Sequence, residues 1–157
     1  MKGTIRYVFL GSADFSAVVL TVLGKGGFIP AAVVTNPDRP VGRKHILTPP
    51  PVKTLIAREG WPTKIFQPER MKDIILPLTS LDLDLGVMAA FGRVLPASLL
   101  ALPRHGTVGV HPSLLPRDRG ATPEASHPVI VSSTCSRVSR VTRTSPIGSI
   151  HDLAPRV

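Results

Sequence analysis

The fold is decided by an early stretch of the chain, Ile5-Arg-Tyr-Val-Phe-Leu-Gly-Ser-Ala-Asp-Phe15. Its first six residues are mostly apolar and end at Gly11, which predicts a short buried strand. Apolar residues at helical spacing follow over Phe15–Leu23, and Ala31–Thr35 is a second apolar run typical of a strand. A strand, a glycine turn, a helix and a second strand in this order open a parallel, doubly wound sheet. The sequence therefore predicts an α/β fold.

The turn after the first predicted strand leaves two roles open. Ser12 is a favoured N-cap residue, so we expect its hydroxyl to cap the helix that follows. The turn lacks the spaced glycines of a dinucleotide-binding fingerprint. Its backbone N–H groups either bind an anion at the helix N-terminus or only connect the strand to the helix.

The chain up to residue 111 continues the alternation of strands and helices. The predicted elements are strands at Lys64–Phe66, Leu83–Ala90 and Thr107–His111, and helices over Val52–Arg58, from about Met71, and after Pro96. Pro77 is expected to end or kink the second of these helices, because proline breaks the helical hydrogen-bond pattern.

Charge and composition narrow the class of protein. The chain of 157 residues carries a net charge of +9, with 43% hydrophobic and 4% aromatic residues. The positive charge favours a polyanionic partner such as nucleic acid, although solubility alone would also account for it. The single cysteine, Cys135, excludes an internal disulfide and a cysteine-based metal cluster, and no other residues have metal-ligand spacing. No apolar run reaches transmembrane length and the N-terminus does not resemble a signal peptide, so we expect a soluble intracellular protein without a membrane partner.

The segment Asn36–Pro51 is long for a connection between a strand and a helix, which usually takes about 2–6 residues. It carries Arg39, Arg43, Lys44 and His45 among prolines, and a basic finger of this kind suits phosphate contacts. An exposed surface loop without a ligand is the alternative.

A second informative stretch reads Gly106-Thr-Val-Gly-Val-His-Pro-Ser-Leu-Leu-Pro-Arg-Asp-Arg-Gly120. A short strand that runs into a polar, proline-rich loop is where open α/β sheets usually place their chemistry. Histidine exchanges protons near neutral pH, so His111 is the candidate for proton transfer or for hydrogen bonding to a developing oxyanion. From the residues alone, a purely structural role for this histidine stays open. The end of the preceding strand, Val87–Gly92, would form the opposite wall, and its small residues leave room for a flat ring.

Residues 124–157 differ in composition from the rest of the chain. They contain seven serines and four arginines, and they show neither a helical nor a strand period. We therefore expect this segment to be disordered or loosely attached, and the predicted domain to end at about Pro123.

Four segments resemble the N-terminal formyltransferase domain of the methionyl-tRNA formyltransferases. In chain order they are Val8–Phe15, Val34–Arg43 with Leu47–Lys53, Met88–Pro96, and Val110–Gly120. The resemblance covers residues 1–123. The Ser-Leu-Leu-Pro motif alone would indicate only the wider group of 10-formyltetrahydrofolate-dependent transferases, whereas the proline-rich loop with Arg39 and Arg43 indicates the family that acts on tRNA.

The resemblance implies a Rossmann-like formyltransferase fold, a mostly parallel sheet with helices on both faces. In the family a small β-barrel domain follows, and we expect it to be absent from this chain. It implies transfer of a formyl group from the cosubstrate 10-formyltetrahydrofolate to the amino group of methionyl initiator tRNA, without a metal. His111 matches the family's catalytic histidine. The implied folate-binding residues are Met88, Ala89, Phe91, Gly92, Ser113, Leu114, Leu115 and Pro116. The implied tRNA-binding residues are Arg39, Arg43 and Lys44.

The chain departs from the family pattern in two respects. Gly109 stands where the family has an asparagine, whose amide steadies the oxyanion or the formyl oxygen. The helix, strand and loop that carry the family's catalytic aspartate have no counterpart after Pro123. We therefore expect a fold that is incomplete on its C-terminal side, with an unrelated segment at residues 124–157. An inactive fragment with at most weak folate or tRNA binding is the alternative to an active, monomeric transferase. The bacterial cytoplasm and, alternatively, the mitochondrial matrix suit the family.

Overall fold

A computed structural model of the chain describes residues 5–111 and 130–134. Its centre is a six-stranded sheet with the strand order β5-β2-β1-β6-β7-β8. The strands are β1 (Tyr7–Leu10), β2 (Ala32–Val34), β5 (Lys64–Phe66), β6 (Leu85–Ala89), β7 (Thr107–His111) and β8 (Ile130–Thr134). The first five pair in parallel with their neighbours, and β8 runs antiparallel to β7. The prediction of a mostly parallel α/β sheet is confirmed.

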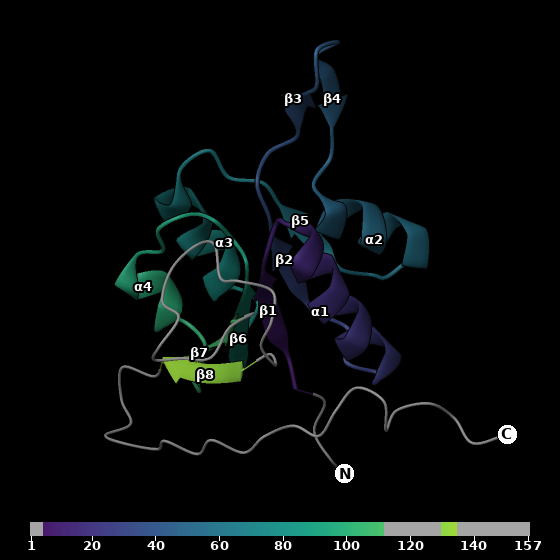
Figure 1. Cartoon of the computed structure of the whole chain (residues 1–157). Coiled ribbons are helices and arrows are strands. Elements are labelled where there is room, and N and C mark those ends of the chain that lie inside the picture. Colours follow the sequence, from purple (N-terminus) through teal and green to yellow (C-terminus); the bar gives the residue numbers. More distant parts are fainter. Residues whose placement is uncertain (1–4, 112–129, 135–157) are drawn as a thin grey trace, which may run out of the picture.

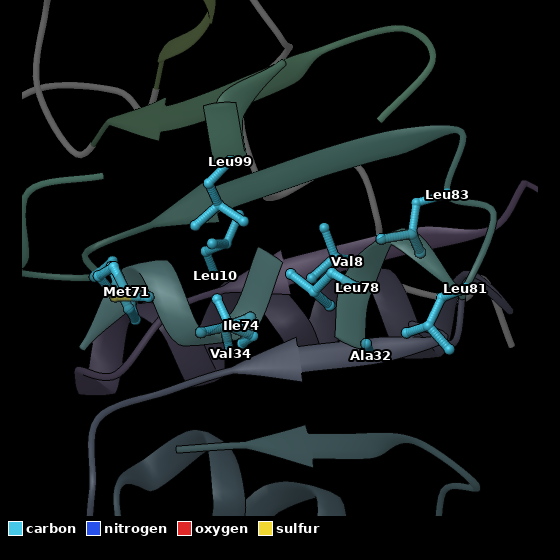
Figure 2. Close-up of a cluster of buried hydrophobic side chains, with 11 residues drawn as sticks. Val8, Leu10, Ala32, Val34, Met71, Ile74, Leu78, Leu81, Leu83 and Leu99 are labelled. Atoms are coloured by element: carbon cyan, nitrogen blue, oxygen red, sulfur yellow. The ribbon is translucent and has the colours of Figure 1, made fainter. Parts of the chain in front are cut away.

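Helices cover both faces of this sheet (Figure 1). On one face lie α1 (Asp14–Lys25) and α2 (Pro51–Glu59), and on the other lie the 3₁₀ helix η1 (Met71–Ile74), α3 (Ile75–Thr79) and α4 (Ala97–Leu100). Because successive residues of a strand point to opposite faces, the central strand β1 contributes to both cores. Tyr7 and Phe9 pack with α1 and α2, while Val8 and Leu10 pack with α3 and α4 (Figure 2).

The start of α1 differs from the prediction. The helix begins at Asp14, and Ala13, not Ser12, occupies the N-cap position. The Ser12 hydroxyl instead accepts the backbone N–H of Asn36 at 3.0 Å. The predicted cap is wrong because a backbone N–H from the segment after β2, distant in sequence, takes up the serine oxygen.

The buried side of α1 also differs from its apolar pattern. Val18 and Val22, which belong to the predicted helical spacing, are 60% and 59% exposed. Leu20 and Ser16 are fully buried between the helix and the sheet. The spacing identified the helix correctly, but apolar residues on both sides of α1 left its inward side undecided.

The predicted loop Asn36–Pro51 contains a β-hairpin. β3 (Arg39–Val41) and β4 (Ile46–Thr48) pair antiparallel, and the hairpin extends away from the sheet and helices (Figure 1). Gly42 and His45 in its turn have φ values of 72° and 49°, which bring the two strands back alongside each other. The strands are short and proline interrupts the first, so the sequence pattern does not reveal them.

Two further predictions are corrected. Pro77 does not end the helix; it lies in the first turn of α3, where a missing N–H removes no helical hydrogen bond. The prediction that residues 124–157 form no regular structure is wrong for β8, which pairs with the outer edge of β7. The remainder of that segment lies outside the described residues. None of the helices in the described part of the chain is long and apolar enough to span a membrane.

Candidate active site at the carboxyl edge of the sheet

The carboxyl ends of β1, β6 and β7 lie side by side, because these three strands are adjacent and parallel. The order of the strands along the chain reverses between β1 and β6, since β2 and β5 extend to one side and β7 to the other. In open α/β sheets, ligands bind in the crevice outside the carboxyl ends at this reversal. The loops after these strands are therefore the first place to look for a site.

Gly11, directly after β1, allows three elements to approach closely at this edge. A Cβ atom at this position would lie 2.6 Å from Phe9 Cε1, 2.7 Å from Ser16 Cβ and 2.9 Å from the carbonyl oxygen of Ala89. All three distances are too short for carbon in van der Waals contact, so any larger residue would push β1, α1 and β6 apart. The glycine is needed here for space.

Ser16, in the first turn of α1, joins the helix to the end of β6. Its hydroxyl donates to the carbonyl oxygen of Ala89 at 2.6 Å and accepts the backbone N–H groups of Ser12 at 3.0 Å and Ala13 at 3.1 Å. The side chain is fully buried, so these bonds satisfy polar groups that water does not reach. The role of Ser16 was not predicted from the sequence; the available signal was a hydroxyl in the first turn of an otherwise mostly apolar helix.

The end of β6 has an unusual backbone. Ala90 has φ +40° and Gly92 has φ +72°, and a non-glycine residue in this region is uncommon. Both residues are exposed, while Phe91 between them is 3% exposed and packs in the core. Of the residues predicted to contact folate, Ala89 is buried and Met88 is partly buried. The surface available to a flat ligand here is therefore mainly main chain and small side chains.

Arg93 fixes the loop that follows. Its guanidinium donates to the carbonyl oxygens of Pro68 at 2.7 Å and Glu69 at 2.5 Å, in the segment after β5. This loop therefore packs against a segment from the far edge of the sheet, which limits how far the wall of the site can open.

His111 is the last residue of β7 and is partly buried. In the β6–β7 ladder, Met88 pairs with Gly109 and Ala89 pairs with Val110, so His111 lies next to the end of β6. The structure thus brings the predicted histidine and the predicted β6 wall together. The other predicted folate-binding residues, Ser113, Leu114, Leu115 and Pro116, lie outside the described part of the chain.

The predicted tRNA-binding residues form a separate group on the hairpin. Arg39 lies in β3, and Arg43 and Lys44 lie in the turn between β3 and β4. All three are exposed, and none of them forms an ion pair with another residue in 5–111 or 130–134. The hairpin follows β2, which is separated from β7 by β1 and β6, so it leaves the sheet about 14 Å from the end of β7 at ordinary strand spacing.

A family model described as formyl transferase matches residues 5–127. The chain belongs to this family. The match extends slightly beyond the boundary predicted at about Pro123. The chain is 50% identical over 121 residues to the methionyl-tRNA formyltransferase of Halalkalibacterium halodurans, a match that covers 76% of this chain and 38% of that protein. It is 48% identical over 120 residues to the methionyl-tRNA formyltransferase of Staphylococcus aureus, with 75% and 38% covered. The chain therefore spans well under half the length of these relatives.

Solved structures of formyl-group enzymes share the fold. Glycinamide ribonucleotide transformylase 1 from Geobacillus kaustophilus superposes with a TM-score of 0.54 at 25% identity, over 75% of this chain and 63% of that one. A formyltetrahydrofolate deformylase from Pseudomonas syringae superposes with a TM-score of 0.55 at 17% identity, over 78% and 40% of the two chains. The Rossmann-like formyltransferase fold is thus confirmed. Within the described residues, no group of histidine, cysteine, aspartate and glutamate side chains could hold a metal ion.

Proposed function

We propose that this chain transfers a formyl group from 10-formyltetrahydrofolate to the amino group of methionyl initiator tRNA. The observation that carries the proposal is the 50% identity over 121 residues to a methionyl-tRNA formyltransferase, a span that includes both the carboxyl edge of the sheet and the basic hairpin. We further propose that the protein is a monomer that needs no metal, located in the bacterial cytoplasm or, alternatively, in the mitochondrial matrix.

The proposed chemistry is acyl transfer without a covalent enzyme intermediate. The amino nitrogen of the aminoacyl-tRNA attacks the formyl carbon, which gives a tetrahedral intermediate with a negative oxygen. His111 takes a proton from the attacking amine as the carbon–nitrogen bond forms. The bond to N10 of the folate then breaks, N10 receives the proton, and tetrahydrofolate leaves. The position of Gly109 offers no side-chain donor to the oxyanion.

Each substrate is assigned to a different part of the fold. The folate lies against the end of β6 (Met88, Ala89, Phe91, Gly92). The side chains of Ala89 and Phe91 are buried, so the contact there is with the main chain around the exposed Gly92. Ser113, Leu114, Leu115 and Pro116 are assigned to the folate by the resemblance alone, since they lie outside the described residues. The tRNA is held through its phosphates by Arg39, Arg43 and Lys44 on the hairpin.

Formation of formylmethionyl-tRNA from charged initiator tRNA and 10-formyltetrahydrofolate tests the proposal. We expect product with the full chain and a loss of about 10²–10⁴ in rate for His111→Ala, because this is the usual contribution of a general acid–base residue. His105→Ala is the matched control, since His105 is exposed and precedes β7 outside the site. Absence of product from the full chain would favour the alternative of an inactive binding fragment, to which the glycine at position 109 also points.

A further inference from the structure

Within residues 5–111 and 130–134, the hairpin is attached to the rest of the molecule only through its base. Residues 39–49 are all exposed, and in the described part of the chain the hydrogen bonds of residues 39–48 stay within the hairpin. The first strand leaves from the end of β2 and the second runs into α2. The angle of the hairpin relative to the sheet therefore depends on what fixes these two connections.

Lys53, in the first turn of α2, links the two connections. Its Nζ donates to both carboxylate oxygens of Asp38, at 2.9 and 2.7 Å, and to Oε1 of Gln67 at 2.9 Å. An ammonium group has three hydrogens, and all three are used. Asp38 directly precedes β3, and Gln67 directly follows β5, so one side chain fixes three segments.

Gln67 completes the network. Its Nε2 donates to Oδ1 of Asp38 at 2.6 Å and to the carbonyl oxygen of Asn36 at 2.8 Å, so both amide hydrogens are used. Hydrogen bonds from Gln67 and Lys53 hold the pKa of the Asp38 carboxyl below its usual value. The side chains of Lys53 and Asp38 are 33% and 25% exposed, so the ion pair is partly shielded from water.

The network continues to the loop after β1. The backbone N–H of Asn36 donates to the Ser12 hydroxyl at 3.0 Å, and the Thr35 hydroxyl donates to the same oxygen at 3.2 Å. Ser12 is in turn bonded through its N–H to Ser16, which contacts the end of β6. A continuous series of hydrogen bonds therefore connects the base of the hairpin to the carboxyl edge where the candidate active site lies.

We propose that Lys53 is a positioning residue that, with Asp38 and Gln67, sets the direction of the basic hairpin relative to the active-site edge. Lys53 acts through the hairpin and does not itself contact the nucleic acid. The inference rests on the proposed function only for the identity of the hairpin's ligand, the acceptor end of a tRNA.

The direction of the hairpin can be measured without any ligand. Nitroxide labels on Val41→Cys in β3 and Val22→Cys on α1, both exposed sites, report the distance between hairpin and body in the full chain with Cys135→Ser. We expect a narrow distance distribution that becomes broad in Lys53→Met, which keeps the length of the side chain but has no donors. Lys53→Arg should restore part of the order, and Lys72→Met, at an exposed lysine outside the network, should leave the distribution unchanged.

Gln67→Leu is a second variant, to be used if Lys53→Met unfolds. An unchanged distribution in a folded Lys53→Met or Gln67→Leu protein overturns the proposal.

Binding to a synthetic acceptor-stem RNA supplies the second measurement. If only a fraction of Lys53→Met molecules holds the hairpin in the competent direction, the apparent affinity falls by the inverse of that fraction. The dependence of affinity on salt should stay that of the unmodified chain, because no phosphate contact is lost. A salt slope that falls by about 1 would make Lys53 a phosphate ligand and overturn the positioning role. A broad distribution with unchanged RNA affinity would keep the inference about direction and refute the RNA-binding role of the hairpin.

Discussion

The salt dependence of tRNA binding gives the most direct test of the hairpin. The perturbation is the triple change of Arg39, Arg43 and Lys44 to alanine. The hairpin from residue 39 to 48 has these three cations and no carboxylate, and all three side chains are exposed. Nearby Asp38 is already paired with Lys53, and in the described part of the chain no carboxylate forms an ion pair with any of the three cations.

The expected magnitude follows from counterion release. Each cation that contacts a phosphate of a duplex contributes about −0.9 to the slope of log affinity against log salt, so three contribute about −2.7. A fourfold increase in salt, from about 50 to about 200 mM, therefore changes the hairpin's contribution by about 40-fold. Arg43→Ala alone should remove about a third of the slope, which corresponds to about 3.5-fold over the same range.

The assay is fluorescence anisotropy with a labelled initiator tRNA across this range of salt. The control is a second triple variant, Lys25, Lys64 and Lys72 to alanine, which removes the same charge from exposed sites on the body. Charge steering over the whole molecule would lower the affinity of both triple variants alike. Equal slopes for the two triple variants would refute direct contact between the hairpin and the phosphates.

Three further predictions concern the body of the fold. Gly109→Asn should raise the rate of formyl transfer by about 10²–10³, because one oxyanion donor is typically worth this factor; an unchanged rate in single-turnover kinetics would mean that the site does not use a donor there. Ser16→Ala should lower the free energy of unfolding by about 1–3 kcal/mol, measured by urea denaturation, because it leaves buried N–H and C=O groups without a partner. The pKa of the Asp38 carboxyl is lower in the folded state, so its contribution to stability is present above the unfolded pKa of about 3.9 and is lost as pH falls through the folded pKa. Asp38→Asn should therefore lose less stability than the unmodified chain between about pH 5 and pH 2, and identical pH profiles would contradict this assignment.

The parallel sheet could be predicted from the sequence because its signals are local. Each buried strand is a short apolar run with a glycine, proline or polar break at its end, as at Gly11 after β1. The hairpin and β8 could not be predicted in this way. The hairpin is exposed, and its sequence has no apolar alternation. Strand β8 depends on pairing with the backbone groups at the edge of β7, and the sequence of β8 alone does not reveal this partner.

The residues of the candidate site likewise include some that could be located from the sequence and some that could not. His111 and the end of β6 could be located from sequence, because both follow directly from where predicted strands end. Ser16 and Lys53 could not, because their roles depend on partners 73 and 15 residues away in the chain. A hydroxyl or an ammonium group gives no sign in the sequence of which distant carbonyl or carboxylate it will bind.

Because of the length of the hairpin, a small change in the hydrogen-bond network at its base produces a larger displacement of its turn. From its base to its turn the hairpin spans about five residues, or about 16 Å at ordinary strand rise. A tilt of about 20° at the base therefore moves the cationic turn by about 5 Å. A displacement of about 1 Å between reacting groups is enough to cost about 10²-fold in rate, and the hairpin leaves the sheet about 14 Å from the end of β7. If the turn holds the tRNA and His111 is the catalytic residue, as proposed, the tRNA reaches His111 correctly only when the base is fixed. Lys53 would then affect the rate although it touches neither substrate.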